Sequence, residues 1–218
     1  MSKKNICILI MARLSSQRVN RKVLKKVNGE TLIDLSLKKI NSHLISKKYK
    51  CYYACGDKKL IKIGKKYKNF ELIIRDKDSI NTDQIKVAYN FVKKIKEKYI
   101  LWLNPCSPFI KISTILNAIK TFQNSKIRSL TTVCKEKTWI YNSKKVSYSD
   151  NKKLSTKEIK PIYLATHNFH IYNKKFFLKG YQYFRNKKND PYLYEMSDLE
   201  SLDIDTYEDL KFVRKIKL

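Results

Sequence analysis

The sequence predicts an α/β fold: a doubly wound, mostly parallel β-sheet with helices on both faces and a small antiparallel excursion. The first observation is that short apolar runs of strand length alternate with segments whose apolar residues recur every three to four positions. This alternation is typical of parallel strands joined by helices, and right-handed crossovers wrap those helices around both faces of the sheet. The second observation is that the alternation stops after Cys134, where short aromatic runs between polar turns predict antiparallel strands.

Each predicted strand is a short apolar run bounded by polar or charged residues. The first, 5–11, is far shorter than the roughly 20 apolar residues of a membrane span, and no small-residue cleavage site follows it. We therefore interpret it as a buried strand. The later strand candidates are 50–55, 70–74, 99–103, 128–134, 166–173 and 200–205.

The predicted helices lie between these strands and carry apolar residues at helical spacing. Segment 82–98 is amphipathic and begins at a capping residue, either Asn81 or Thr82. The last helix opens with Thr206 and has Asp209 three residues later, which is the form of a capping box with Asp in place of Glu. The helix candidates are 31–44, 57–68, 82–98, 111–124, 174–180 and 206–216.

The chain of 218 residues predicts one domain, 1–218, because no linker or internal repeat divides it. Within this domain we interpret 137–163 as a β-flap or a dimerisation arm. Five cysteines without a CxxC pair indicate reduced, mostly buried thiols. Together with the lack of a signal peptide or a membrane span, they predict a cytoplasmic protein.

The net charge of +29 comes from 48 lysines and arginines against 19 acidic residues. Only seven of the basic residues are arginines, and the lysines are spread over every segment. This pattern favours a solvated lysine coat, with neither nucleic acid nor a membrane as partner, over a basic nucleic-acid or anionic-surface binding protein. The arginines are then the informative cations, and Arg13, Arg18 and Arg21 lie within nine residues of one another.

Polar side chains follow several predicted strands, at the sheet edge where ligands bind in this fold class. Residues 13–22 follow the first strand and are cationic, residues 104–108 follow the fourth and are neutral, and Asp203 and Asp205 end the last. Arginine and lysine hold phosphate oxygens, whereas carboxylates hold Mg²⁺. The edge therefore predicts a phosphate ester with a divalent metal, although the GxxxxGK[ST] and GxGxxG phosphate loops are both absent.

Four motifs in order resemble those of the CMP-sugar synthetases, the acylneuraminate and 3-deoxy-manno-octulosonate cytidylyltransferases. The pattern after the first strand is matched by Ala12, Arg13, Ser16, Arg18, Lys22 and Leu24, followed by NGETLI at 28–33. The loop NPCSP at 104–108 resembles the family's QPTSP loop. NFHIY at 168–172 resembles its NGxxY strand, and ESLDIDTYEDL at 200–210 resembles its carboxyl-terminal motif.

This resemblance implies a nucleotidyltransferase of Rossmann-like fold. The implied reaction is Mg²⁺-dependent transfer of CMP from CTP to an acidic sugar, sialic-acid-like or a related nonulosonate, with release of pyrophosphate. It further implies a homodimer that serves cell-surface glycan synthesis, in lipopolysaccharide or capsule.

The resemblance also implies roles for particular residues. The expected catalytic residues are Arg13, Lys22 and Asp205, and the expected metal ligands are Asp203 and Asp205. The expected nucleotide-binding residues are Ala12, Arg13, Ser16, Arg18, Lys22, Arg75, Asp83 and Asn104. The expected acceptor-binding residues are Ser107, Asn168, His170 and Tyr172. Two aspartates two apart on a strand project to the same face of the sheet, which suits joint metal binding.

Structural alternatives stay open for several of these residues. Asn104 and Ser107 are also typical of a turn around prolines, and Arg75 and Asp83 of a surface ion pair or a helix cap. Asp205 also suits a helix N-terminus.

The sequence departs from the family pattern at Asn104, where the sialic-acid enzymes have Gln, and at Cys106, where they have Thr. In the family's NGxxY motif, Asn168-Phe169 stands here in place of Asn-Gly. The segment between Arg75 and Asp83 is shorter than the corresponding segment of the family. Two further hypotheses therefore stay within the family: a cytidylyltransferase for a non-sugar phosphate or phosphonate acceptor, and a non-catalytic member.

Overall fold

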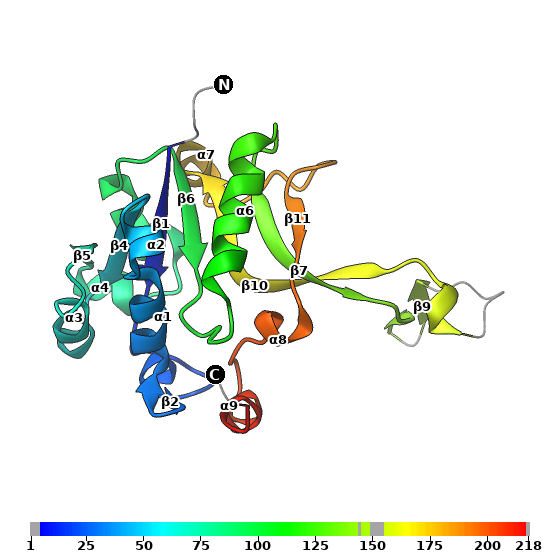
Figure 1. The fold of residues 1–218 in the computed structure, drawn as a ribbon, viewed down its shortest axis with the longest axis horizontal. Helices are drawn as coiled ribbons and strands as arrows, with labels where there is room; N and C mark the ends of the chain where they lie inside the picture. The colour runs from blue at the N-terminus through cyan, green and yellow to red at the C-terminus, as the bar shows by residue number, and fades with distance from the viewer. Residues whose placement is uncertain (1–4, 144, 149–154, 217–218) are drawn as a thin grey trace.

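The computed structural model describes residues 5–143, 145–148 and 155–216. Its centre is a seven-stranded sheet of order β11-β7-β10-β6-β1-β4-β5 (Figure 1). The strands are β1 (Ile6–Met11), β4 (Lys50–Cys55), β5 (Phe70–Ile74), β6 (Tyr99–Leu103), β7 (Leu130–Glu136), β10 (Ile162–Asn173) and β11 (Tyr192–Glu195). Only β10 runs antiparallel to its neighbours, β6 and β7, and the other pairs are parallel, which confirms the predicted fold class.

Helices cover both faces of this sheet. They are α1 (Leu32–Ile40), α2 (His43–Ser46), α3 (Lys58–Gly64), α4 (Lys77–Ile80), α5 (Ile85–Ala88), α6 (Ile112–Asn124), α7 (Lys174–Gly180), α8 (Asp198–Ser201) and α9 (Tyr207–Arg214). Short 3₁₀ turns are η1 (Lys22–Leu24), η2 (Asn90–Lys94) and η3 (Thr156–Glu158). None of the helices in the described part of the chain combines the length and apolar character that a bilayer crossing requires.

The buried strand β1 shows why the layers form. Ile8 and Ile10 pack with α1 and α6 on one face, whereas Cys7 and Leu9 pack with η2 and α7 on the other. Successive side chains of a strand point to opposite faces, so a continuous apolar run is buried on both. All five cysteines are free, and four of them are buried.

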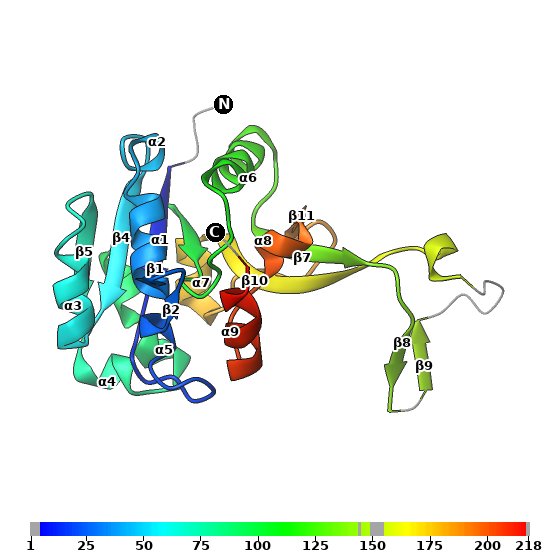
Figure 2. The same ribbon diagram turned by 60° about the horizontal axis from the view of Figure 1, so that its bottom comes forward.

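The excursion after Cys134 projects from the body of the molecule. β7 and β10 continue past the sheet as a two-stranded ribbon, and the antiparallel pair β8 (Ile140–Asn142) and β9 (Lys145–Tyr148) lies at its far end (Figures 1 and 2). The antiparallel character is thus confirmed, and its role as a dimer arm stays a prediction. Of the predicted arm, residues 144 and 149–154 lie outside the described residues.

The helix predicted over 82–98 is wrong, because the structure has the short helix α5 and the 3₁₀ turn η2 instead. The guanidinium of Arg75 donates to the carbonyl of Ala88 at 3.0 Å, and this carbonyl would accept the Val92 N–H in a continuous α-helix. The Val92 N–H instead bonds to the carbonyl of Tyr89. A side chain from a distant loop therefore ends the helix.

The strand predicted over 200–205 is also wrong. Ser197 accepts the N–H of Glu200 and starts the short helix α8, and the chain from Leu202 to Asp205 is irregular. Glu200 is buried and accepts from the N–H of Lys111 and the hydroxyl of Thr114, which caps the start of α6. The argument that two aspartates share one face of a strand therefore no longer applies. The capping box of α9, Thr206 with Asp209, is confirmed.

Two extra strands belong to a small pair outside the main sheet, β2 (Lys26–Val27) and β3 (Glu30–Thr31). They lie with α9 at the lower edge of the sheet in Figure 1, where the carboxyl ends of β1 and β6 also point. The turn between them contains Asn28 and Gly29, both with positive φ, at 48° and 84°. This hairpin lets the chain return to α1 directly after the cationic loop.

Candidate functional site

A cavity of about 280 Å³ opens beyond the carboxyl ends of β1 and β6. It is enclosed by the end of each strand and the loop that follows it. The residues around it are Met11, Ala12, Arg13, Ser15, Ser16, Gln17, Arg18, Lys22, Val23, Trp102, Asn104, Pro105 and Cys106. Six of the eight predicted nucleotide-binding residues are among them.

The loop between β1 and η1 has no glycine, and side-chain hydrogen bonds hold its shape. The N–H of Leu14 donates to the carboxylate of Asp57 at 3.1 Å. The hydroxyl of Ser15 donates to the carbonyl of Ile80 at 2.9 Å. These two bonds attach the loop to the segments that follow β4 and β5, so its cationic side chains are fixed relative to the sheet.

Arg13 lies between this cavity and a second hollow of about 310 Å³ that Asp83 also lines. Its guanidinium donates to the carbonyl of Thr82 at 3.0 Å and forms an ion pair with Asp83 at 3.2 Å. The Asp83 side chain is 75% exposed, so this pair is weakly held in solvent. The pair places Arg13 at the mouth of the cavity.

Lys22 and Arg18 converge on one carboxylate oxygen, Oδ1 of Asp205, each at 2.8 Å. The Lys22 side chain is 15% exposed, whereas that of Arg18 is 64% exposed. Burial alone would lower the pKa of Lys22, but the nearby Cys106, Asp205 and Asp203 outweigh it and raise the pKa. Lys22 therefore stays charged although it is largely removed from water.

Asp203 lies beside this pair and is bound by the loop after β6. The side-chain N–H of Asn104 donates to Asp203 at 3.0 Å, and the backbone N–H of Ile204 donates to its other oxygen at 2.9 Å. Burial is the main cause that raises the pKa of Asp203; Lys22 lowers it and Asp205 raises it again. The buried Ile204 donates its N–H to the carbonyl of Cys106 at 3.2 Å, which attaches both aspartates to the cavity wall.

Asp209, in the first turn of α9, fixes the backbone beside Asp205. One oxygen of its carboxylate accepts the N–H groups of Asp205 at 2.9 Å and Thr206 at 2.7 Å. Hydrogen bonds from these N–H groups lower the pKa of Asp209 against the opposing effect of burial. The α9 capping box thus also orients a carboxylate of the site.

The chemistry of Asp203 and Asp205 fits a magnesium ion. Both supply hard carboxylate oxygens, and Mg²⁺ is usually held by one or two carboxylates together with phosphates of the substrate. The negative charge of Asp205 and burial both disfavour ionised Asp203, and a bound cation would offset that cost. Within residues 5–143, 145–148 and 155–216, no group of three or more His, Cys, Asp or Glu forms a site that could hold a metal without substrate.

Arg75 does not line the cavity, which corrects its expected contact with ribose or base. Its side chain is 4% exposed, and the guanidinium donates to the carbonyls of Ser79 and Ala88. It also lies over the ring of Phe91, 5.3 Å from the centroid. Its contacts are those of a residue that holds the segment after β5 together.

The predicted acceptor residues are buried as well. Ser107, Asn168, His170 and Tyr172 are each at most 3% exposed. The strand parity that put His170 and Tyr172 toward an acceptor instead directs them to the interior. Phe177 of α7 packs on Tyr172, and Tyr183 and Phe184, which follow α7, pack on His170. Asn168 accepts the N–H of Asn104 at its carbonyl and donates to the carbonyl of Ser201, so it supports the loop from below.

Among the residues of the site that sequence reasoning missed are Trp102 and Asp57. Trp102 lines the cavity from the next-to-last position of β6, where its apolar character made it read as core. Asp57 follows the end of β4, and a search after every strand, the second included, would have found it.

Comparison with known proteins gives a consistent result. The family model described as cytidylyltransferase matches residues 7–218. Two curated 3-deoxy-manno-octulosonate cytidylyltransferases, from Rickettsia bellii and Rickettsia akari, are 26% and 27% identical over 136 residues. That alignment covers 62% of this chain and 54% of each relative, so the chain matches only about half of their length.

Two solved structures share the fold. A CMP:2-keto-3-deoxy-manno-octonic acid synthetase complexed with CTP superposes with a TM-score of 0.68 at 12% identity, over 97% of this chain and 98% of the other. A 4-diphosphocytidyl-2C-methyl-D-erythritol synthase from Anaerococcus prevotii gives a TM-score of 0.68 at 16% identity, over 97% and 95%.

Proposed function

The chain belongs to the cytidylyltransferase family, and from this premise we propose that it transfers CMP from CTP to an acidic sugar and releases pyrophosphate. The observation that carries the proposal is the convergence of Lys22 and Arg18 on Asp205 at a cavity beyond the ends of β1 and β6. Lys22 and Arg18 would neutralise a triphosphate, and Asp205 would suit a magnesium ion. The two kinds of group are joined here by direct hydrogen bonds.

The proposed work of these residues is electrostatic. Lys22, Arg13 and Arg18 would bind the triphosphate and stabilise the charge that develops on the departing pyrophosphate. Their present partners, Asp83 and Asp205, are 75% and 40% exposed, so phosphate oxygens can replace them at low cost. The fixed loop would hold the α-phosphorus in line with the attacking oxygen of the acceptor.

We propose Asp203 and Asp205 as the residues that would hold Mg²⁺. When bound there, the ion would supply charge neutralisation at the phosphate oxygens. Asn104 would keep Asp203 in place, and Asp209 would keep the Asp205 backbone in place.

The acidic sugar is proposed because the curated relatives are named for 3-deoxy-manno-octulosonate. The same proposal places the enzyme in the cytoplasm, as a homodimer formed through the β7–β10 arm, in a pathway of cell-surface glycan synthesis. The projection of β8 and β9 away from the body supports the arm (Figure 2).

The test is pyrophosphate release by the purified chain with CTP, Mg²⁺ and a panel of acceptors. We expect release only with an acidic sugar, and its loss in Lys22→Gln but not in Lys26→Gln, an exposed lysine of β2. Release with only a phosphorylated or phosphonate acceptor would overturn the sugar part. Tight, salt-dependent nucleic-acid binding without affinity for CTP would overturn the whole proposal.

A further inference from the structure

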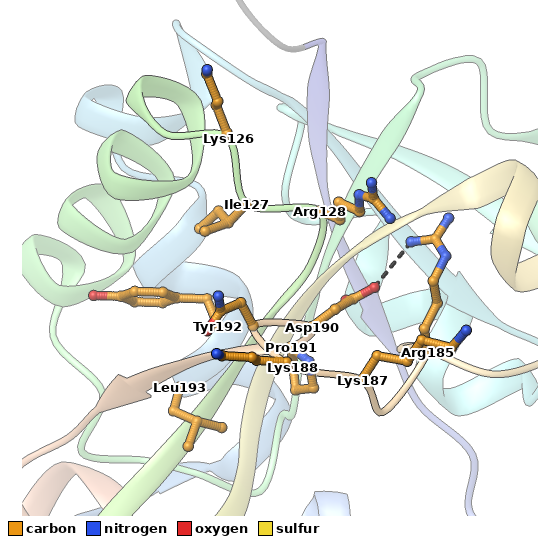
Figure 3. Close-up of a pocket in the computed structure, with 11 residues that line it drawn as sticks. Lys126, Ile127, Arg128, Arg185, Lys187, Lys188, Asp190, Pro191, Tyr192 and Leu193 are labelled. Carbon is orange, nitrogen blue, oxygen red and sulfur yellow. Dashed lines mark hydrogen bonds and ion pairs between the residues drawn. The ribbon is translucent and has the colours of Figure 1, made fainter.

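A larger cavity, of about 770 Å³, lies at the opposite edge of the sheet from the site above. It is bounded by the segment between α6 and β7, the turn before β11, and the start of β11 (Figure 3). β10 is antiparallel to both β6 and β7, so β7 runs in the same direction as β6. The start of β7 therefore lies at the amino-terminal edge of the sheet, whereas the first cavity lies beyond the carboxyl end of β6. The two cavities are separate.

The charge of this cavity is strongly one-sided. Its walls carry five cations, Lys126, Arg128, Arg185, Lys187 and Lys188, and a single carboxylate, that of Asp190. Two of the chain's seven arginines lie here, whereas a lysine coat scattered over the surface explains neither of them. Among the described residues, Arg128 has no ion pair.

One arginine of the cavity is held in a fixed orientation. Arg185 forms an ion pair with Asp190 at 3.0 Å, and its guanidinium lies over the ring of Phe176, 4.5 Å from the centroid. Asp190 is 5% exposed and also accepts a hydrogen bond from Ser129. In Figure 3 the guanidinium groups of Arg128 and Arg185 lie on the same side of this carboxylate. An ordered guanidinium binds an anion at a lower entropic cost than a free one.

The turn before β11 fixes the backbone at two of the lysines. Lys187 and Asp190 exchange backbone hydrogen bonds of 3.0 and 2.9 Å. Asn186 and Asn189 adopt positive φ, at 53° and 62°, which asparagine tolerates better than most residues. Lys187 and Lys188 extend from the two sides of this turn (Figure 3).

We propose that this cavity binds a compact, multiply charged phosphate compound. Five cations around one hollow repel one another, and a polyanion relieves that repulsion. Guanidinium groups match phosphate oxygens in pairs, and the volume lies in the range of small-molecule sites. The phosphate can belong to a free solute or to the headgroup of a lipid, and both sources share this chemistry.

Isothermal titration of the full chain with inorganic pyrophosphate, without Mg²⁺, tests the proposal. Lys22→Gln weakens the proposed nucleotide site, and we expect pyrophosphate binding at the second cavity to persist in this variant. Adding Arg128→Gln and Lys188→Gln should weaken that binding about tenfold or more. The matched control adds Lys65→Gln and Lys66→Gln, two exposed lysines at the end of α3, and should leave it unchanged. Thermal melts would show that all variants fold.

A parallel titration with vesicles containing phosphatidylinositol 4-phosphate, whose headgroup is multiply charged, separates the two sources. Vesicle binding that pyrophosphate competes away and that requires Arg128 assigns a lipid headgroup. Pyrophosphate binding without vesicle binding assigns a free solute. Binding of neither probe in the Lys22→Gln variant, or equal effects of the Arg128/Lys188 and Lys65/Lys66 substitutions, overturns the proposal. The result is independent of the proposed reaction, because no readout uses CTP turnover.

Discussion

Polar side chains near the ends of β1, β5 and β6 fall into two regions with different partners. On the open rim, Arg18 and Lys22 pair with a carboxylate that is 40% exposed. In the interior, Arg75 is 4% exposed and His170 is 1% exposed, and their partners are backbone carbonyls, a hydroxyl or another ring. The interior region is not fully bonded, because Nε and Nη1 of Arg75 are buried without a hydrogen-bond partner. The number of bonds therefore does not distinguish the two regions.

The difference lies in which partners can be exchanged. A solvent-exposed ion pair is worth little, and an incoming anion can replace its carboxylate. A buried polar group has no such substitute, because breaking its bond leaves an unsatisfied group in the core. Substitutions on the rim should therefore change activity at constant stability, and substitutions in the interior should do the reverse. The five experiments below test this division.

Lys22→Gln should have the largest effect. The cation is 15% exposed and lines the cavity, so in the proposed reaction its removal would take charge stabilisation away from the departing pyrophosphate. We expect the rate of pyrophosphate release to fall by roughly 10²–10³-fold, with a thermal midpoint within a few degrees of the parent. Lys26→Gln is the matched control. A large loss of stability with normal activity would move Lys22 into the interior class.

Asp205→Asn should have the next largest effect, a decrease of about 10²-fold in the rate of pyrophosphate release. The substitution keeps the shape of the side chain but removes the charge that faces Lys22 and Arg18 and would face magnesium. Rates measured against Mg²⁺ concentration should show a raised metal requirement. Glu208→Gln, an exposed carboxyl in the first turn of α9, controls for the loss of one negative charge. An unchanged metal requirement would contradict the assignment.

Arg75→Lys tests the interior. Lysine keeps the charge but is shorter and lacks the guanidinium plane, so it loses the Nη2 hydrogen bonds to the carbonyls of Ser79 and Ala88 and the packing over the Phe91 ring. We expect the free energy of unfolding to fall by about 2–4 kcal/mol, with little change in KM for CTP. Urea unfolding of this variant and of Lys77→Gln, an exposed neighbour, makes the measurement. A raised KM at unchanged stability would return Arg75 to the nucleotide site.

The division between rim and interior also explains what the sequence could predict. Strands β4, β5 and β6 have the predicted bounds, because polar or charged residues on either side of an apolar run mark where the strand begins and ends. The loop cations were found from their position after β1, since all parallel strands deliver their following residues to one edge. Parts of the fold that depend only on local pattern and strand direction were therefore readable.

The failures involve bonds between distant segments. No local signal shows that Arg75 takes the Ala88 carbonyl, so the helix break at that residue was invisible. Likewise, alternation predicts which residues of β10 share a face, but not that α7 covers Tyr172 and the segment after it covers His170. The strand over 200–205 failed for a different reason. Ser197 and Glu200 have the spacing of a capping box, and that signal was in the sequence.

The stability of the interior should depend on pH through His170. Burial, with a smaller effect of His167, lowers the pKa of His170 to about 3, so the ring is neutral in the folded protein. Its other close neighbours are Thr131, Trp102, Tyr183 and Phe184, and none of them supplies a negative charge at neutral pH.

An unfolded histidine takes up a proton near pH 6.5, so the unfolded state binds more protons below that pH. The stabilising contribution is therefore complete above about pH 6.5 and is lost as the pH falls toward 3. Between pH 7 and 5 we expect a loss of about 2 kcal/mol in the free energy of unfolding. His170→Gln should remove this part of the pH slope even if it lowers stability at every pH. Identical slopes in the two proteins would show that the ring is accessible to protons.

Arg18→Gln should have the smallest effect and tests the rim most sharply. Arg18 contacts the same oxygen of Asp205 as Lys22, at the same 2.8 Å, but its side chain is 64% exposed. Because the two cations have the same distance to Asp205 but differ in exposure, comparing their variants distinguishes the effect of distance from that of solvent screening. If screening governs the contribution, KM for CTP should rise only a few-fold, and the difference from the parent should shrink as salt increases. Arg21→Gln, an exposed arginine that does not line the cavity, is the control. An effect as large as that of Lys22→Gln, unchanged by salt, would mean that the loop closes over the nucleotide and removes Arg18 from water.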